Sequence, residues 1–142
     1  MKDEFLYDTN VLCYAYDLSE PTKRKTCMTL VHKIFAGEEK GIVSNQILVE
    51  LYNALTCKLD VKADTAKVIV ESFVASTNWL KISYSHITVR TALNTSKVFK
   101  TPFLDTLIAE TMKENGISQI VTENEKDFAR IPGIRVINPL VP

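Results

Sequence analysis

Short apolar segments alternate along the chain with longer stretches in which apolar residues recur at helical spacing. The short segments predict five strands, at residues 4–8, 41–44, 79–83, 118–122 and 134–138. The longer stretches predict helices at residues 22–38, 45–59, 63–76, 85–97 and 102–114. Strands that alternate with helices are typical of a parallel sheet covered on both faces, so the expected fold class is α/β, a three-layer α/β/α sandwich.

Local signals indicate where several of these helices begin and end. Ser44 or Asn45 can cap the helix after the second strand, because a side-chain oxygen there can accept from a free backbone N–H. Pro102 is expected at the first helical position, where its missing N–H has no consequence. Gly37 and Gly116 are expected to end the helices that precede them.

The composition is that of an ordinary globular protein, with 142 residues, 46% hydrophobic and 24% charged, and the length suits a single domain over residues 1–142. No apolar run approaches the eighteen or so residues of a membrane span. The first ten residues carry acids where a secretion signal needs a basic start, so a cytoplasmic protein is expected. Reduced, buried thiols are expected for the three cysteines, which form no CxxC pair: Cys13, Cys27 and Cys57.

Three acidic residues stand where the carboxyl ends of the predicted strands meet. Asp8 ends the first strand, Asp105 lies in the first turns of the helix leading into the fourth, and Asp127 follows the fourth. Ligands of doubly wound sheets bind beyond this edge, where the strand order reverses. Carboxylates gathered there without partners repel one another. A hard divalent cation such as Mg²⁺ or Mn²⁺ resolves the repulsion, because it prefers oxygen ligands.

A fourth acid, Glu50, belongs to a helix that is apolar around most of its circumference. Gln46, Glu50 and Asn53 form a narrow polar stripe on it, at positions i, i+4 and i+7. A largely buried helix with one polar stripe turns that stripe to water, to a partner or to a polar cleft. Glu50 is therefore a candidate for the same site as the other three acids.

Each acid also has a simpler interpretation when it is taken alone. Asp8 could be a turn or cap residue, and Asp105 could serve the helix dipole. Asp127 could be a surface charge in the polar run ENEKD, and Glu50 an unpaired residue at a rim. All four acids occur at the same topological edge, which is much less expected by chance. The joint pattern favours a metal-dependent phosphodiesterase.

Other chemistries lack the residues that they need. The sequence contains no nucleophile elbow, CxxC pair or glycine-rich phosphate loop, and His32 and His86 are isolated, so we interpret both as non-functional. The net charge is zero, but setting the four site acids aside leaves 17 basic against 13 acidic groups. Basic clusters at residues 23–25 and at Lys97 with Lys100 could contact phosphates, although such runs usually form solvated faces.

Four motifs, which together span essentially the whole chain, carry a resemblance to the PIN-domain ribonucleases. In size and motif order the chain is most similar to the VapC-type toxins of toxin–antitoxin pairs. The motifs are FLYDTNVL (5–12), SNQILVELYNAL (44–55), FLDTLIAETM (103–112) and IVTENEKDFARIPGIRVINP (120–139). The last is the most specific, because it joins the pattern T-x-N-x-x-D-F, from Thr122 to Phe128, to a final strand.

The resemblance implies a PIN-like fold with about five parallel strands and an acidic cleft around Mg²⁺ or Mn²⁺. By position it assigns two sets of residues, the catalytic and metal-binding acids Asp8, Glu50, Asp105 and Asp127, and the supporting polar groups Thr9, Thr122 and Asn124. It further implies endoribonuclease activity, a homodimer, and a small antitoxin that enters the cleft. The expected reaction is hydrolysis of an RNA phosphodiester by an in-line water, with one cation or two about 3.5–4 Å apart.

Alternative functions stay open at this stage. Housekeeping RNA-processing nucleases share the domain, and a binding module could keep the fold without activity. A phosphoacceptor signalling domain is disfavoured, because it needs an acidic pair after the first strand and an Asp after the third. The chain instead has Thr9 and Asn10 after Asp8, and Tyr84-Ser85-His86 after the third strand.

The helices at residues 22–38 and 45–76 carry more apolar side chains than one side of the sheet can cover. The excess comprises Tyr52, Val68, Ile69, Phe73 and Val74. A groove left over is a ready site for an amphipathic helix of a partner protein. A basic side chain of that partner could reach the neighbouring acidic cleft and bind two carboxylate oxygens.

Overall fold

A computed structural model describes residues 4–141 and contains one sheet of five strands in the order β3-β2-β1-β4-β5. Each neighbouring pair is parallel. The strands are β1 (Phe5–Tyr7), β2 (Gly41–Ser44), β3 (Trp79–Ile82), β4 (Gln119–Val121) and β5 (Arg135–Ile137). This confirms the predicted parallel sheet, although four of the strands are shorter than predicted.

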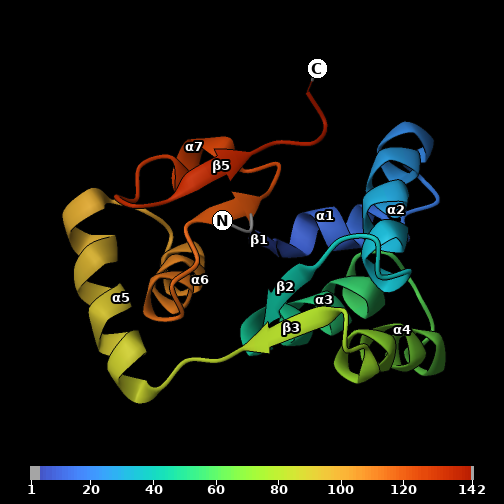
Figure 1. The fold of residues 1–142 in the computed structure, drawn as a ribbon, viewed down its shortest axis with the longest axis horizontal. Coiled ribbons are helices and arrows are strands. Elements are labelled where there is room, and N and C mark those ends of the chain that lie inside the picture. Colours follow the sequence, from blue (N-terminus) through green and yellow to red (C-terminus); the bar gives the residue numbers. More distant parts are fainter. Residues whose placement is uncertain (1–3, 142) are drawn as a thin grey trace.

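The helices form a layer on each face of the sheet. They are α1 (Thr9–Tyr14), α2 (Pro21–Phe35), α3 (Asn45–Cys57), α4 (Ala63–Ala75), α5 (His86–Phe99), α6 (Phe103–Glu114) and α7 (Glu125–Phe128). Crossovers between parallel strands are right-handed, so the steps from β1 to β3 place α1–α4 on one face, and the reverse steps to β4 and β5 place α5–α7 on the other. Figure 1 shows α5 beside α6, apart from α1–α4.

Two short helices were missed by the sequence prediction. The first is α1, which Asp8 caps by accepting from the backbone N–H of Thr9. The second is α7, which Asn124 caps by accepting from the N–H of Asp127. With six and four residues, neither helix is long enough to display a 3.6-residue period.

Several predicted helix limits move by a few residues. The helix predicted at 22–38 ends at Phe35, because Gly37 adopts the left-handed backbone region with φ 82°. Of the two candidate caps for α3, Ser44 and Asn45, it is Ser44 that accepts from the N–H of Ile47. Pro102 was wrongly placed inside α6, because its ψ of 136° is extended and makes it the residue before the helix. An extended residue there still brings Asp105 into the first turn.

An aromatic cluster fills the core between the sheet and one helix layer. The ring of Trp79 lies 4.9 Å from that of Phe73 and 5.8 Å from that of Phe35, measured between centroids. Phe73 is fully buried, so its predicted place on an exposed apolar face is wrong, and Ile69 is partly buried against the core. Apolar side chains that do remain exposed on α3 and α4 are Val49, Tyr52, Val68 and Val74.

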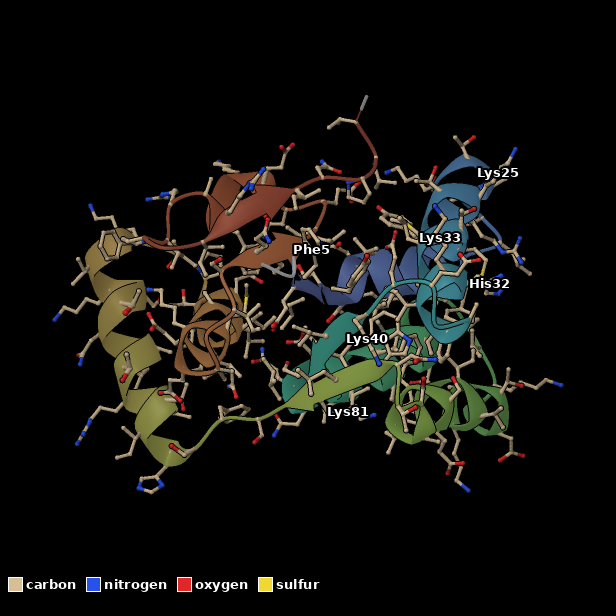
Figure 2. All side chains as sticks on the ribbon, in the orientation of Figure 1. Phe5, Lys25, His32, Lys33, Lys40 and Lys81 are labelled. Carbon is tan, nitrogen blue, oxygen red and sulfur yellow. The ribbon has the colours of Figure 1, made fainter. Side chains whose placement is uncertain are left out.

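One of the three cysteines is more exposed than expected. Cys27 is buried, whereas Cys13 is half-buried and Cys57, the last residue of α3, is exposed. All three are free thiols, so the expectation of buried thiols was wrong for Cys57. His32 is exposed on α2, as is the adjacent Lys33 (Figure 2). Within residues 4–141, no helix combines the length and the apolar character that crossing a membrane requires.

The strand order reverses next to β1. From β1 the chain moves through β2 to β3, and it then returns to place β4 on the opposite side of β1. The carboxyl ends of β1 and β4 therefore flank the switch point at which ligands of such sheets bind. Asp8 directly follows β1, and Thr122 directly follows β4.

Candidate active site

Asp8 is a buried carboxylate held at the end of β1. Its side chain is 5% exposed, and its backbone N–H still donates to Val121 of β4. Oδ1 accepts from the N–H of Thr9 at 2.8 Å. Oδ2 accepts from the Thr122 hydroxyl at 2.8 Å and from the Asn10 amide at 3.3 Å. Asp8 is thus both a helix cap and an oriented carboxylate at the switch point.

Glu50 is held on both of its carboxylate oxygens by neighbouring side chains. The hydroxyl of Thr9 donates to Oε1 at 2.8 Å, and Nε2 of Gln46 donates to Oε2 at 2.9 Å. Since the backbone N–H of Thr9 contacts Asp8, this one residue bridges both acids. The polar stripe predicted on α3 therefore faces the carboxyl end of β1.

Asp105 and Asp127 share the amide of Asn124. Its Nδ2 donates to Oδ2 of Asp105 at 3.0 Å and to Oδ2 of Asp127 at 3.2 Å. The backbone N–H of Asn124 donates in turn to the hydroxyl of Thr122 at 3.0 Å, which connects this pair to Asp8. The segment after β4 therefore organises three of the four acids.

A cleft of about 510 Å³ opens beside these residues. It is lined by Asp8, Glu50 and Asp105 and by the polar residues Thr9 and Asn124. Asp127 is not among the lining residues but accepts a hydrogen bond from the lining residue Asn124. The chain thus brings the four acids together in one network, with three of them at the cleft wall and the fourth one hydrogen bond away.

Comparison of the sequence with protein families gives one match, to the PIN domain, over residues 5–134. The match covers most of the chain and includes all four acids. The chain belongs to the PIN-domain family. No curated protein matches this PIN domain at a significant level.

Solved structures share the fold of this PIN domain along nearly its whole length. The DNA-bound VapBC complex of Salmonella typhimurium is 22% identical, with a TM-score of 0.69, covering 97% of this chain and 99% of that chain. VapBC2 of Rickettsia felis bound to a promoter DNA fragment is 18% identical, with a TM-score of 0.68 and coverage of 95% and 98%. VapC20 of Mycobacterium tuberculosis, a toxin that cleaves the sarcin–ricin loop, is 16% identical, with a TM-score of 0.67 and coverage of 88% and 93%. These likenesses confirm the predicted PIN-like α/β/α fold.

Two of the acids in this PIN domain have pKa values well above the usual range. Burial raises the pKa of Asp8 to about 6, against the lowering effect of its hydrogen bonds from Thr122 and Thr9, and the charge of Glu50 raises it further. Burial also raises the pKa of Asp105 to about 7, and the next causes are the charges of Asp8, Asp127 and Glu50. The carboxylates are close enough to oppose one another's ionisation, which is the repulsion expected from the sequence.

The donor atoms around the cleft suit a hard divalent cation by their chemistry. Each carboxylate oxygen has two lone pairs, so an oxygen already held by a protein donor can still bind a cation. Oxygen donors of this kind favour Mg²⁺ or Mn²⁺ over zinc. Within residues 4–141, no three Asp, Glu, His or Cys side chains lie close enough together to hold a metal ion as they stand.

Three residues near the acids, Asn10, Gln46 and Lys58, have contacts or positions that the sequence did not predict. Asn10 contacts Asp8 and Thr122 and accepts from the backbone of residue 123, and its position after Asp8-Thr9 was the available signal. Gln46 was recognised as part of a polar stripe but not as a donor to Glu50. Lys58 lines the cleft and lay outside both predicted basic clusters. Its position depends on where α3 ends, which the sequence does not specify.

Proposed function

We propose that this PIN domain is a metal-dependent endoribonuclease that hydrolyses RNA phosphodiester bonds. The observation that carries the proposal is the set of oriented carboxylates from Asp8, Glu50 and Asp105 at one cleft, with Asp127 joined to Asp105 through Asn124. Family membership supports it, and one structural neighbour, VapC20, is itself an RNA-cleaving toxin. The complete set of four acids argues against a module that kept the fold and lost activity.

In this mechanism the carboxylates of Asp8, Glu50 and Asp105 would hold Mg²⁺ or Mn²⁺, with Asp127 acting through Asn124. A cation bound there supplies polarisation of the phosphoryl oxygen and a lower pKa for the attacking water. Thr9 fixes the relative orientation of Asp8 and Glu50, because its N–H and hydroxyl each hold one of them. Thr122 and Asn124 do the same for Asp8 and Asp105.

The direct test is cleavage of total cellular RNA by the purified protein with Mn²⁺, with Mg²⁺ and with EDTA. We expect new RNA 5′ or 3′ ends with either cation and none in EDTA, while single-stranded DNA of matched length stays intact. Cleavage that persists in EDTA would contradict the metal requirement. Cleavage of the DNA at an equal rate would contradict the substrate class.

Lys58 is expected to bind a phosphate of the substrate. Within residues 4–141, Lys58 is the only cleft-lining residue with a basic side chain, and it forms no ion pair there. Lys58→Ala should weaken RNA binding in EDTA and reduce the slope of log affinity against log salt by about 0.7, the value for one contact to a single strand.

Lys40→Ala is the matched control for Lys58, because it removes the same charge from an exposed position just before β2, at the opposite end of that strand from the cleft (Figure 2). Both variants should melt at nearly the native temperature. Equal salt slopes for the two variants would show that Lys58 has no phosphate contact.

Mg²⁺ is expected to raise the melting temperature of the native protein. If the dissociation constant is about 1 mM, then 10 mM Mg²⁺ adds roughly RT ln 11, or about 1.4 kcal/mol, to the free energy of unfolding. For a chain of this length the shift is roughly 3–6 °C. Thermal melts in Mg²⁺ and in an equal ionic strength of NaCl check this, and a shift of the same size in NaCl would indicate screening alone.

We further propose that the chain is the toxin of a VapBC-type pair, acting in the cytoplasm as a homodimer with a small antitoxin. Its structural neighbours include toxin–antitoxin complexes from Klebsiella pneumoniae and Salmonella typhimurium. The exposed side chains of Val49, Tyr52 and Val68 on α3 and α4 would receive the partner's helix. Co-purification from the native host, with cleavage measured before and after the partner is removed, tests this. A chain that purifies alone and cleaves at full rate would be a housekeeping nuclease.

A further inference from the structure

Gln46 is a buried amide that connects two elements of the site. It is the second residue of α3, and its side chain is 8% exposed. Nε2 donates to Oε2 of Glu50 at 2.9 Å and also to the backbone carbonyl of Leu104 at 3.0 Å. Leu104 directly precedes Asp105 in the first turn of α6. One amide nitrogen therefore ties the carboxylate of one acid to the backbone beside another.

With this contact the hydrogen bonds around the cleft form a closed ring. Thr9 joins Asp8 to Glu50, and Gln46 joins Glu50 to the start of α6. Asn124 then joins Asp105 to Thr122, which returns the ring to Asp8. Thr9 and Asn124 sit next to the sheet, on segments that β1 and β4 fix. Gln46 follows β2 in the same way, and its side chain joins α3 to α6, two helices from opposite layers.

The orientation of the Gln46 amide is fixed by its two acceptors. A rotation that exchanged its oxygen and nitrogen would place Oε1 against a carboxylate oxygen and a backbone carbonyl, and oxygen atoms repel in that arrangement. In the observed orientation, Oε1 is buried and has no hydrogen-bond partner in the structure. Buried polar atoms without partners are uncommon and unfavourable. The fold tolerates the unpartnered Oε1 here because the same orientation lets Nε2 donate to both Glu50 and Leu104.

We infer that Gln46 is a positioning residue that sets the separation between Glu50 and Asp105, and so the affinity of the cleft for its divalent cation. The inference rests on the proposed function, since it concerns how that site binds its cation. Gln46 is not among the residues that line the cleft. It holds Glu50 by one contact and the α6 N-terminal turn by the other, against the mutual repulsion of the acids. Loss of such outer contacts typically weakens metal binding 10–100-fold.

Gln46→Met tests the inference, because methionine has a similar length and fills the buried space without donating a hydrogen bond. We expect the Mn²⁺ dissociation constant, measured by titration calorimetry without RNA, to rise about 10–100-fold. The Mn²⁺ concentration that gives half-maximal cleavage should rise by a similar factor, whereas RNA affinity in EDTA should stay at the native value. If Gln46 had only a structural role, its replacement would not weaken Mn²⁺ binding while leaving the RNA affinity unchanged.

Asn78→Leu is the matched control. The amide of Asn78 is half-buried and donates to the backbone carbonyl of Phe35 at 3.1 Å, so its loss also removes a contact between a side chain and a helix end. Asn78 precedes β3, at the end of the sheet away from the cleft, and the variant should bind Mn²⁺ like the native protein. If Gln46→Met does not fold, Gln46→Asn replaces it, because the shorter amide stays polar but cannot reach both acceptors.

The outcomes separate the two claims. If the native protein binds Mn²⁺, and the Gln46 variant and Asn78→Leu both bind it with the native affinity, the inference is overturned and the proposed function stands. A native protein that neither binds Mn²⁺ nor cleaves RNA would overturn the proposed function, and this inference with it. Weakened Mn²⁺ binding in the Gln46 variant alone would establish the positioning role.

Discussion

Replacing Asp8 by asparagine is expected to lower metal-dependent RNA cleavage by on the order of 10²–10³-fold. A divalent cation in such sites stabilises the transition state by several kcal/mol, and each 1.36 kcal/mol is about tenfold in rate. Asp8 is buried at the switch point, with both of its oxygens oriented by neighbouring donors. Asparagine keeps the shape and removes the charge that would bind the cation. Single-turnover cleavage at saturating Mn²⁺ provides the measurement.

Asp17→Asn is the matched control for this substitution. Asp17 also lines the cleft, so the same charge is removed from the same surface. Its carboxylate accepts from the backbone and the hydroxyl of Ser19 and takes no part in the hydrogen-bond ring. We expect this variant to retain most of the native rate. Near-native cleavage by a folded Asp8→Asn protein would remove the central claim of the mechanism.

The metal-free protein is expected to lose stability as the pH rises from about 4 to about 7, and Asp105→Asn should remove part of that loss. The pKa of Asp105 is raised to about 7 in the folded state, first by burial and then by the neighbouring acids. A carboxyl whose pKa is raised on folding binds its proton more tightly in the folded state. Its penalty is therefore absent below the unfolded pKa, grows as the pH rises, and is complete above the folded pKa.

Thermal melts in EDTA at pH 4 and pH 8 test this expectation. Because Asp105 is partly exposed, solvent screening reduces its penalty to ~1 kcal/mol. The asparagine variant should then melt roughly 2–4 °C above the native protein at pH 8, and close to it at pH 4. Comparing the two proteins cancels the titrating groups that do not interact with Asp105, including Glu123, whose lowered pKa acts in the opposite sense. An equal difference at both pH values would contradict the assignment.

The sheet and the placement of the acids could be predicted from the sequence because they depend on local patterns. Strand positions follow from short apolar runs, and Ser44 caps α3 as its side chain predicts. Asp8 and Asp105 follow from their positions at a strand end and a helix start. The topology then brings these ends to one edge of the sheet, whatever the details of packing.

The contacts within the site could not be predicted, because they depend on tertiary packing. Phe73 has the same helical spacing as exposed apolar neighbours, and only its contact with Trp79 shows that it is buried. Gln46 finds its second acceptor on a backbone carbonyl 58 residues away, which no side-chain pattern reveals. Asp127 contacts Asn124 and does not line the cleft, and the four-residue helix α7 that carries it leaves no periodic signal.

The pairing of β1 with β4 determines when the site can exist during synthesis. Asp8 receives its hydrogen bond from Thr122, which is 114 residues further along the chain. Until the ribosome has released β4 and the segment after it, the nascent chain has neither the central strand pair nor Asn124 and Asp127 in place. Strand pairing between segments so distant in sequence is also slow. A chain cut short before residue 119 would lack β4, Thr122, Asn124 and Asp127, and with them the contacts that hold Asp8 and Asp105 in place.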